Sequence, residues 1–174
     1  MRRTVFLIGG RASGKTTLGR LLAERLTEPF VDTDDLVVEN VGMSIAEYVA
    51  QQGWEAFRDR ETEALRSVCG GPPLVVACGG GIVLREANRA MLAQGLTIYL
   101  HAPAGVLAQR LAADPKEAQR PSLTGKALAE EVAMVLAERE PLYRACAWAV
   151  LPSNQEMAEL LDAVLEIVQD HERV

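Results

Sequence analysis

Cysteine is scarce in this sequence. The 174 residues include three cysteines, Cys69, Cys78 and Cys146, and no two of them form a CxxC pair. This number and spacing exclude the disulfide framework of a small secreted domain and speak against a zinc site. We therefore expect free thiols in a reducing compartment, and a cytoplasmic protein.

Long apolar runs and basic stripes are also missing. The first apolar segment, residues 4–8, is too short for a signal peptide or a membrane span. The net charge of -6 is spread along the chain, so no stripe of Lys and Arg is available to neutralise a phosphate backbone. We expect no membrane or nucleic-acid partner, and nothing in the sequence requires more than a monomer.

Short β-branched apolar runs alternate with longer segments of helical periodicity. This pattern is typical of a parallel sheet covered by helices on both faces, and the length fits one domain, residues 1–174. We predict an α/β fold, a three-layer α/β/α sandwich with a five-stranded parallel sheet. Strands are expected at 5–8, 30–31, 74–77, 96–100 and 148–151, and helices near 15–27, 34–69, 85–94, 103–112, 126–145 and 154–170.

Two segments depart from this alternation. Residues 34–69 are longer than one crossover needs and contain Gly42 and Gly53, so we expect two or three helices standing beside the sheet. Residues 113–126 carry two prolines, a glycine and several charges between helices. That composition predicts a mobile loop.

The strongest motif is the run GGRASGKT at residues 9–16, a complete GxxxxGK[ST] between a strand and a helix. Such a loop points its backbone N–H groups at phosphates, while Lys15 reaches the β- and γ-phosphates and Thr16 offers a hydroxyl to Mg²⁺. The alternative, a glycine-rich turn without a ligand, does not account for the whole motif. The loop predicts nucleotide binding but leaves the phosphoryl acceptor open, because GTPases, ATPases and small-molecule kinases share it.

Three carboxylates, Asp32, Asp34 and Asp35, follow the second strand, at the sheet edge where α/β proteins bind ligands. One could serve the metal while another orients or deprotonates a hydroxyl nucleophile. The alternative is a capping cluster for a helix that begins near Leu36. The neighbouring P-loop favours the functional interpretation.

Glycines and arginines supply the remaining candidates. The strand at 74–77, expected beside the P-loop strand, runs into three glycines at 79–81, which indicates either close approach of a ligand or a flexible turn. Arg58, Arg120 and Arg139 are candidate anion clamps, because a guanidinium binds a carboxylate or phosphate through two parallel hydrogen bonds. For each one alone, a surface salt bridge is the competing interpretation.

Taken together, these segments resemble shikimate kinase, a P-loop kinase of the nucleoside-monophosphate-kinase type. The resemblance covers nearly the whole chain. It is carried by GGRASGKTT (9–17), FVDTD (30–34), GWEAFRDRE (53–61), CGGG (78–81), QRPSLTGK (119–126) and EREPLY (138–143).

The resemblance implies transfer of the γ-phosphoryl group of ATP, with Mg²⁺, to the 3-hydroxyl of shikimate in chorismate and aromatic amino acid biosynthesis. It also implies a substrate-binding helical region at about 33–61 and a mobile lid at about 112–126. The implied catalytic residues are Lys15, Asp34 and Arg120, and the implied metal ligands are Thr16 and Asp32. ATP would be bound by Ala12, Ser13, Gly14, Lys15, Thr16, Thr17, Arg110 and Arg120, and shikimate by Asp34, Arg58, Gly79, Gly80 and Arg139.

Two positions depart from the family pattern. Cys78 stands where relatives usually carry Thr or Ser, and residues 149–153 lack an acidic residue that is common there. Two other functions stay open: a gluconate or nucleoside-monophosphate kinase of the same build, and a non-catalytic nucleotide-binding switch. The switch lacks support because the chain has no Asn-Lys-x-Asp motif. Trp54 is expected to be a core residue without a chemical role.

Overall fold

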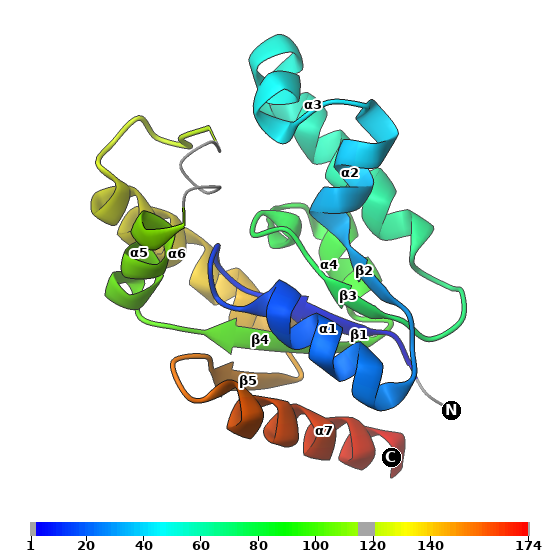
Figure 1. Ribbon diagram of the computed structural model, residues 1–174. Helices are drawn as coiled ribbons and strands as arrows, with labels where there is room; N and C mark the ends of the chain where they lie inside the picture. The colour runs from blue at the N-terminus through cyan, green and yellow to red at the C-terminus, as the bar shows by residue number, and fades with distance from the viewer. Residues whose placement is uncertain (1–2, 115–120, 174) are drawn as a thin grey trace.

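One parallel sheet organises the molecule (Figure 1). The computed structural model describes residues 3–114 and 121–173. Five strands lie in the order β2-β3-β1-β4-β5, and every neighbouring pair is parallel, which confirms the predicted sheet. The strands are β1 (Val5–Ile8), β2 (Phe30–Asp32), β3 (Val75–Ala77), β4 (Leu96–His101) and β5 (Ala149–Pro152).

Helices cover both faces of this sheet. Alternate residues of β1 point to opposite faces, so Val5 and Leu7 enter one apolar core while Phe6 and Ile8 enter the other. The first core is closed by α1 and α7, and the second by α4, α5, α6 and the end of α3. The three predicted layers are therefore present. The helices are α1 (Lys15–Leu26), α2 (Thr33–Val41), α3 (Ile45–Ser67), α4 (Glu86–Leu92), α5 (Ala104–Ala113), α6 (Leu128–Cys146) and α7 (Met157–Arg173), with a 3-10 turn η1 (Ile82–Leu84).

The long segment after β2 forms α2 and α3, as expected for two or three helices. Gly42 ends α2 in the left-handed conformation, with φ of 70°. Ser44 and Glu47 form a capping box that begins α3, and α3 breaks at Gly53, where φ is 83° and ψ is 170°. The two helices pack on each other around a small core of their own, which includes Val37.

The strand order places a ligand site at the carboxyl end of β1. The chain passes from β1 to β2 and back to β3 on one side, and then crosses to β4 on the other side. A reversal of this kind leaves a crevice outside the strand ends, where α/β proteins bind ligands. Within the described part of the chain, no helix is long and apolar enough to cross a membrane.

Candidate functional site

The loop after β1 is folded as the P-loop motif requires. Gly14 precedes α1 with φ of 93°, and Ala12 also adopts a left-handed backbone, with φ of 60°. No side chain caps the start of α1, so its first N–H groups face the crevice. The Lys15 Nζ donates to the carbonyl oxygens of Gly9 at 2.9 Å and Gly10 at 2.7 Å. The loop thus combines a helix N-terminus with an ammonium group, a suitable arrangement for polyphosphate.

Thr16 and Asp32 meet beside this loop. The Thr16 hydroxyl donates to Oδ2 of Asp32 at 2.9 Å, while Oδ1 accepts from the backbone N–H of Asp34 at 2.9 Å. Asp32 therefore caps α2, as the capping interpretation expected, and its second oxygen contacts Thr16, so its role toward a metal stays a prediction. α2 begins at Thr33 rather than near Leu36, which brings Asp34 into its first turn.

The donor set suits a magnesium ion that is bound mainly by phosphates. Hydroxyl and carboxylate oxygens are hard ligands, and Mg²⁺ commonly takes only one or two of them from a protein in nucleotide sites. Thr16 and Asp32 offer one of each. The described residues contain no cluster of three His, Cys, Asp or Glu side chains that could hold a metal without such phosphates.

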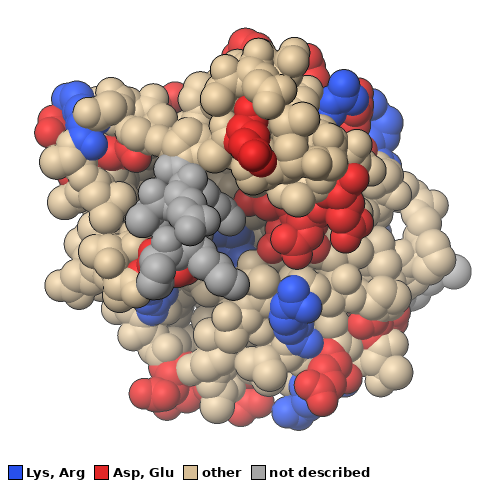
Figure 2. All heavy atoms as spheres, turned by 45° about the horizontal axis from the view of Figure 1, so that its top comes forward, with Lys and Arg blue, Asp and Glu red and all other residues tan. Residues whose placement is uncertain are grey.

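Two connected hollows occupy this end of the sheet, and Figure 2 shows acidic side chains gathered beside a recess in this face. Asp34, Gly80 and Arg11 line both hollows, so the two meet at these residues. The phosphate cleft is also lined by Ala12, Ser13, Gly14, Lys15, Thr16, Thr17, Asp32, Cys78, Gly79, Arg110 and Asp114. The second hollow, called here the acceptor pocket, is also lined by Ile45, Trp54, Phe57, Arg58, Glu61, Gly81, Pro121, Leu123 and Arg139.

Two glycines of the triplet, Gly79 and Gly81, are closely packed, whereas a Cβ at position 80 would come no nearer than 3.5 Å to any other group. A Cβ at position 79 would lie 2.7 Å from a carboxylate oxygen of Asp34 and 2.7 Å from one of Glu61, and a Cβ at position 81 would lie 2.1 Å from Nη1 of Arg58. The backbone N–H of Gly79 donates to the Thr33 hydroxyl at 2.9 Å. The triplet is therefore packed against side chains that line the site, which speaks against a flexible turn, while contact with a ligand stays a prediction.

Two arginines and one buried carboxylate form the back of the acceptor pocket. Arg58 is paired with Glu61, whose side chain is 1% exposed. Burial raises the pKa of Glu61, and the charge of Arg58 opposes that rise. Arg139 is also buried, and its Nε has no hydrogen-bond partner among the described residues. Together with Arg11 and Asp34, which also line the pocket, three guanidinium groups stand against two carboxylates, so the pocket suits a ligand that carries a carboxylate.

Tyr143 supports the floor of the pocket from behind. Its hydroxyl donates to the carbonyl oxygen of Gly80, and its ring stacks on Tyr99 with centroids 5.0 Å apart. Burial raises the pKa of Tyr143 to about 12, so the hydroxyl remains a donor at neutral pH.

The pocket includes residues that the sequence did not single out. Trp54, expected to be core, is only partly buried and lines the pocket, so that expectation is wrong in part. The guanidinium carbon of Arg58 lies 5.3 Å from the ring centroids of both Trp54 and Phe57. Helical spacing in the sequence could have indicated that these residues share one face of a helix. Phe57 and Arg58 lie three and four residues after Trp54, and Glu61 lies four and three residues after them.

Arg110 contacts backbone rather than open solvent. Its Nη1 donates to the carbonyl oxygen of Ala12 at 3.1 Å and its Nη2 to that of Ser153 at 2.7 Å. It thus joins the P-loop to the segment that follows β5. Arg120 and residues 115–119 of the expected lid lie outside the described residues, whereas Pro121 and Leu123, which follow, line the acceptor pocket.

Comparison with known proteins agrees with this site. A family model described as shikimate kinase matches residues 11–169. A shikimate kinase 2 from Yersinia enterocolitica is 49% identical over 98% of both chains. A shikimate kinase from Acinetobacter baumannii, solved in complex with shikimate, is 31% identical, with a TM-score of 0.91 over 98% of this chain and 95% of that one.

A gluconokinase from Sinorhizobium meliloti is more distant. It is 18% identical, with a TM-score of 0.63 over 98% of this chain and 94% of that one, so it shares the fold alone. The family match and the near-complete coverage at 49% identity are much stronger evidence. The chain belongs to the shikimate kinase family, and it is an ATP-dependent kinase.

Proposed function

We propose that this chain transfers the γ-phosphoryl group of ATP to the 3-hydroxyl of shikimate. The observation that carries the proposal is the join between the two hollows: Asp34 and Gly80 line both the phosphate cleft and a pocket backed by Arg58 and Arg139. A bound acceptor would place its carboxylate on the arginines and a ring hydroxyl beside Asp34. Phosphoryl transfer needs mainly this positioning and charge stabilisation.

Each group has a distinct task in this proposal. Lys15 and the P-loop backbone hold the β- and γ-phosphates. Thr16 and Asp32 would hold Mg²⁺, which neutralises charge on the phosphates when it is bound. Asp34 orients the attacking hydroxyl and accepts its proton.

The remaining tasks concern the acceptor and the transferred group. Arg58 and Arg139 grip the acceptor's carboxylate, and the ring rests on Gly80, which lines the acceptor pocket, and on Gly79, which lines the adjoining phosphate cleft. Arg110 holds the P-loop against the segment after β5, on the nucleotide side. Arg120, outside the described residues, is proposed to stabilise charge on the transferred group.

The proposal extends to the whole chain. One sheet with continuous cores on both faces supports a single domain over residues 1–174, in which residues 33–61 form the substrate-binding region and residues 112–126 form the lid. We further propose that it acts as a monomer, because both hollows are built from one chain. Three free cysteines, Cys69, Cys78 and Cys146, suit a reducing, cytoplasmic setting.

The test is ADP release from MgATP by the purified protein, measured with shikimate, gluconate, a mixture of nucleoside monophosphates, or no acceptor. We expect release that depends on shikimate alone, and none from a Lys15→Met variant, which controls for contaminating kinases. Gluconate is also a polyhydroxylated carboxylate, so it is the most demanding comparison. Equal stimulation by gluconate would refute the assignment of the acceptor.

A further inference from the structure

Glu131 is a buried carboxylate that the proposed reaction does not use. It lies in the first turn of α6 and is 5% exposed. Its Oε1 accepts three hydrogen bonds from the loop that precedes the helix: from the Ser122 hydroxyl at 2.6 Å, the Thr124 backbone N–H at 2.7 Å and the Thr124 hydroxyl at 2.9 Å. A single carboxylate oxygen therefore binds two hydroxyls and one backbone N–H of this loop.

The two hydroxyls that donate to Glu131 also accept hydrogen bonds from the backbone of the same loop. The Ser122 Oγ also accepts from the backbone N–H of Gly125 at 2.7 Å, and the Thr124 Oγ1 accepts from that of Lys126 at 3.2 Å. Both hydroxyls are thus oriented by the carboxylate and in turn hold backbone N–H groups. Hydrogen bonds to an ionised acceptor are stronger than neutral ones, so loss of the carboxylate would loosen residues 122–126 together.

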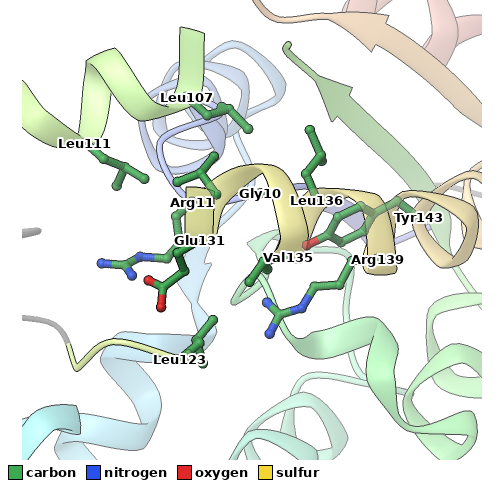
Figure 3. Close-up of a pocket in the computed structure, with 11 residues that line it drawn as sticks. Gly10, Arg11, Leu107, Leu111, Leu123, Glu131, Val135, Leu136, Arg139 and Tyr143 are labelled. Atoms are coloured by element: carbon green, nitrogen blue, oxygen red, sulfur yellow. The ribbon is translucent and has the colours of Figure 1, made fainter. Parts of the chain in front are cut away.

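The opposite side of the same loop faces the acceptor pocket. Pro121 and Leu123 line that pocket, and Leu123 also lines a neighbouring apolar hollow with Val135 and Leu136. Figure 3 shows Leu123 and the Glu131 carboxylate on the same side of this hollow, with Val135 and Leu136 projecting from α6. Leu123 therefore lies between the two hollows, together with Arg11 and Arg139, and its position depends on the anchored residues on each side of it.

We propose that Glu131 is a positioning residue for acceptor binding, which holds residues 121–126 so that Pro121 and Leu123 form one wall of the acceptor pocket. The identity of the acceptor rests on the proposed function, whereas the anchoring of the loop does not. An experiment can therefore test the two separately.

The experiment compares Glu131→Ala with Glu130→Gln in the full chain. Glu130 is the preceding residue of α6 and makes an exposed ion pair with Lys126 at 2.7 Å, which contributes little to stability. We expect Glu131→Ala to raise the KM for shikimate roughly tenfold, with the KM for ATP unchanged. The control variant should leave both KM values unchanged.

Hydrogen exchange supplies a readout that is independent of activity. The amides of Thr124, Gly125 and Lys126 should exchange faster in Glu131→Ala than in the parent and the control. Unchanged exchange would overturn the anchoring, and an unchanged KM for shikimate would overturn its role in acceptor binding. If the parent itself shows no shikimate-dependent activity, the proposed function fails while the exchange result still tests the anchor.

A second variant removes the two hydroxyl hydrogen bonds from the loop side and leaves the bond from the Thr124 backbone N–H in place. Ser122 and Thr124 are exposed, so the double substitution Ser122→Ala, Thr124→Val leaves the buried part of α6 intact. It should reproduce the increase in KM for shikimate. A parental KM in the double variant would also contradict the proposal, even if Glu131→Ala fails to fold.

Discussion

Asp34 lies where the phosphate cleft and the acceptor pocket meet, in the first turn of α2. Replacement by Asn removes the proposed proton acceptor and leaves the P-loop untouched. We expect Asp34→Asn to lower kcat by about 10²–10⁴ while ATP affinity changes little. Steady-state kinetics and nucleotide titration measure the two quantities, and Asp35→Asn, in the same turn but exposed, should behave as the parent.

Arg139 is the buried guanidinium at the back of the pocket. Arg139→Lys keeps the charge but loses the pair of parallel donors, so we expect the KM for shikimate to rise roughly 10- to 100-fold with a smaller change in kcat. Arg144→Lys is the matched control, because Arg144 lies on the same helix and pairs with Glu140 at the surface. A parental KM in Arg139→Lys would argue against a carboxylate clamp.

Asp34, Arg58 and Arg139 were predicted from the sequence, because each lies in a motif shared with shikimate kinases. All three line the acceptor pocket. Glu61 was missed, since a carboxylate three residues from Arg58 and next to Arg60 gives no sign of burial until the packing of α3 is known. The consequence of Cys78, which departs from the family pattern, also depends on its burial in the structure. Burial raises the pKa of its thiol, so the departure at this position concerns packing beneath the site more than reactivity.

At the scale of elements, the break in α3 is a backbone effect. Gly53 has φ of 83°, and a Cβ there would meet nothing within 4 Å. We expect Gly53→Ala to destabilise the protein by about 1 kcal/mol through strain alone. Gly105 is the matched control, because it lies within α5 with equally open surroundings and no positive φ, and Gly105→Ala should stabilise by about 0.5 kcal/mol.

Urea unfolding of both variants measures these changes. Equal effects in the two would contradict the strain explanation. The boundary between α2 and α3 has a signal in the sequence. Gly42 ends α2, and Ser44 caps the start of α3. The predicted helical range began at residue 34, one residue after the observed start of α2, and only the capping interpretation, with a helix from near Leu36, placed the start too late, because Asp32 provides the cap.

For the whole molecule, the pH dependence of stability should report the anchored carboxylate. Burial alone would disfavour the charged form of Glu131, but the hydrogen bonds from Ser122 and Thr124 outweigh it and lower its pKa below the ordinary value of 4.5. The contribution of Glu131 to the free energy of unfolding is therefore present above pH 4.5 and is lost as the pH falls through the lowered pKa.

The measurement is the difference in Tm between the parent and Glu131→Gln. We expect the parent to be more stable at neutral pH and the difference to shrink below about pH 4. The raised pKa of Glu61 acts in the opposite direction, but it is common to both proteins and cancels in the comparison. A difference that grows on acidification would contradict the assignment.

The parallel sheet could be predicted at this scale because buried apolar runs alternated with helices, and β3 lies beside β1 as expected. The full strand order could not be predicted, because the sequences of β4 and β5 contain no signal for the edge of the sheet that each strand joins. The connection between the cleft and the acceptor pocket depends on that order.

The most direct test of the central claim is the position of the new phosphate ester. Phosphorus-coupled NMR of the product formed from MgATP and shikimate should show a single ester on the 3-oxygen, because the proposed arrangement puts one hydroxyl beside Asp34 and the carboxylate on the arginines. A phosphate on another hydroxyl, or inorganic phosphate as the main product, would contradict the account.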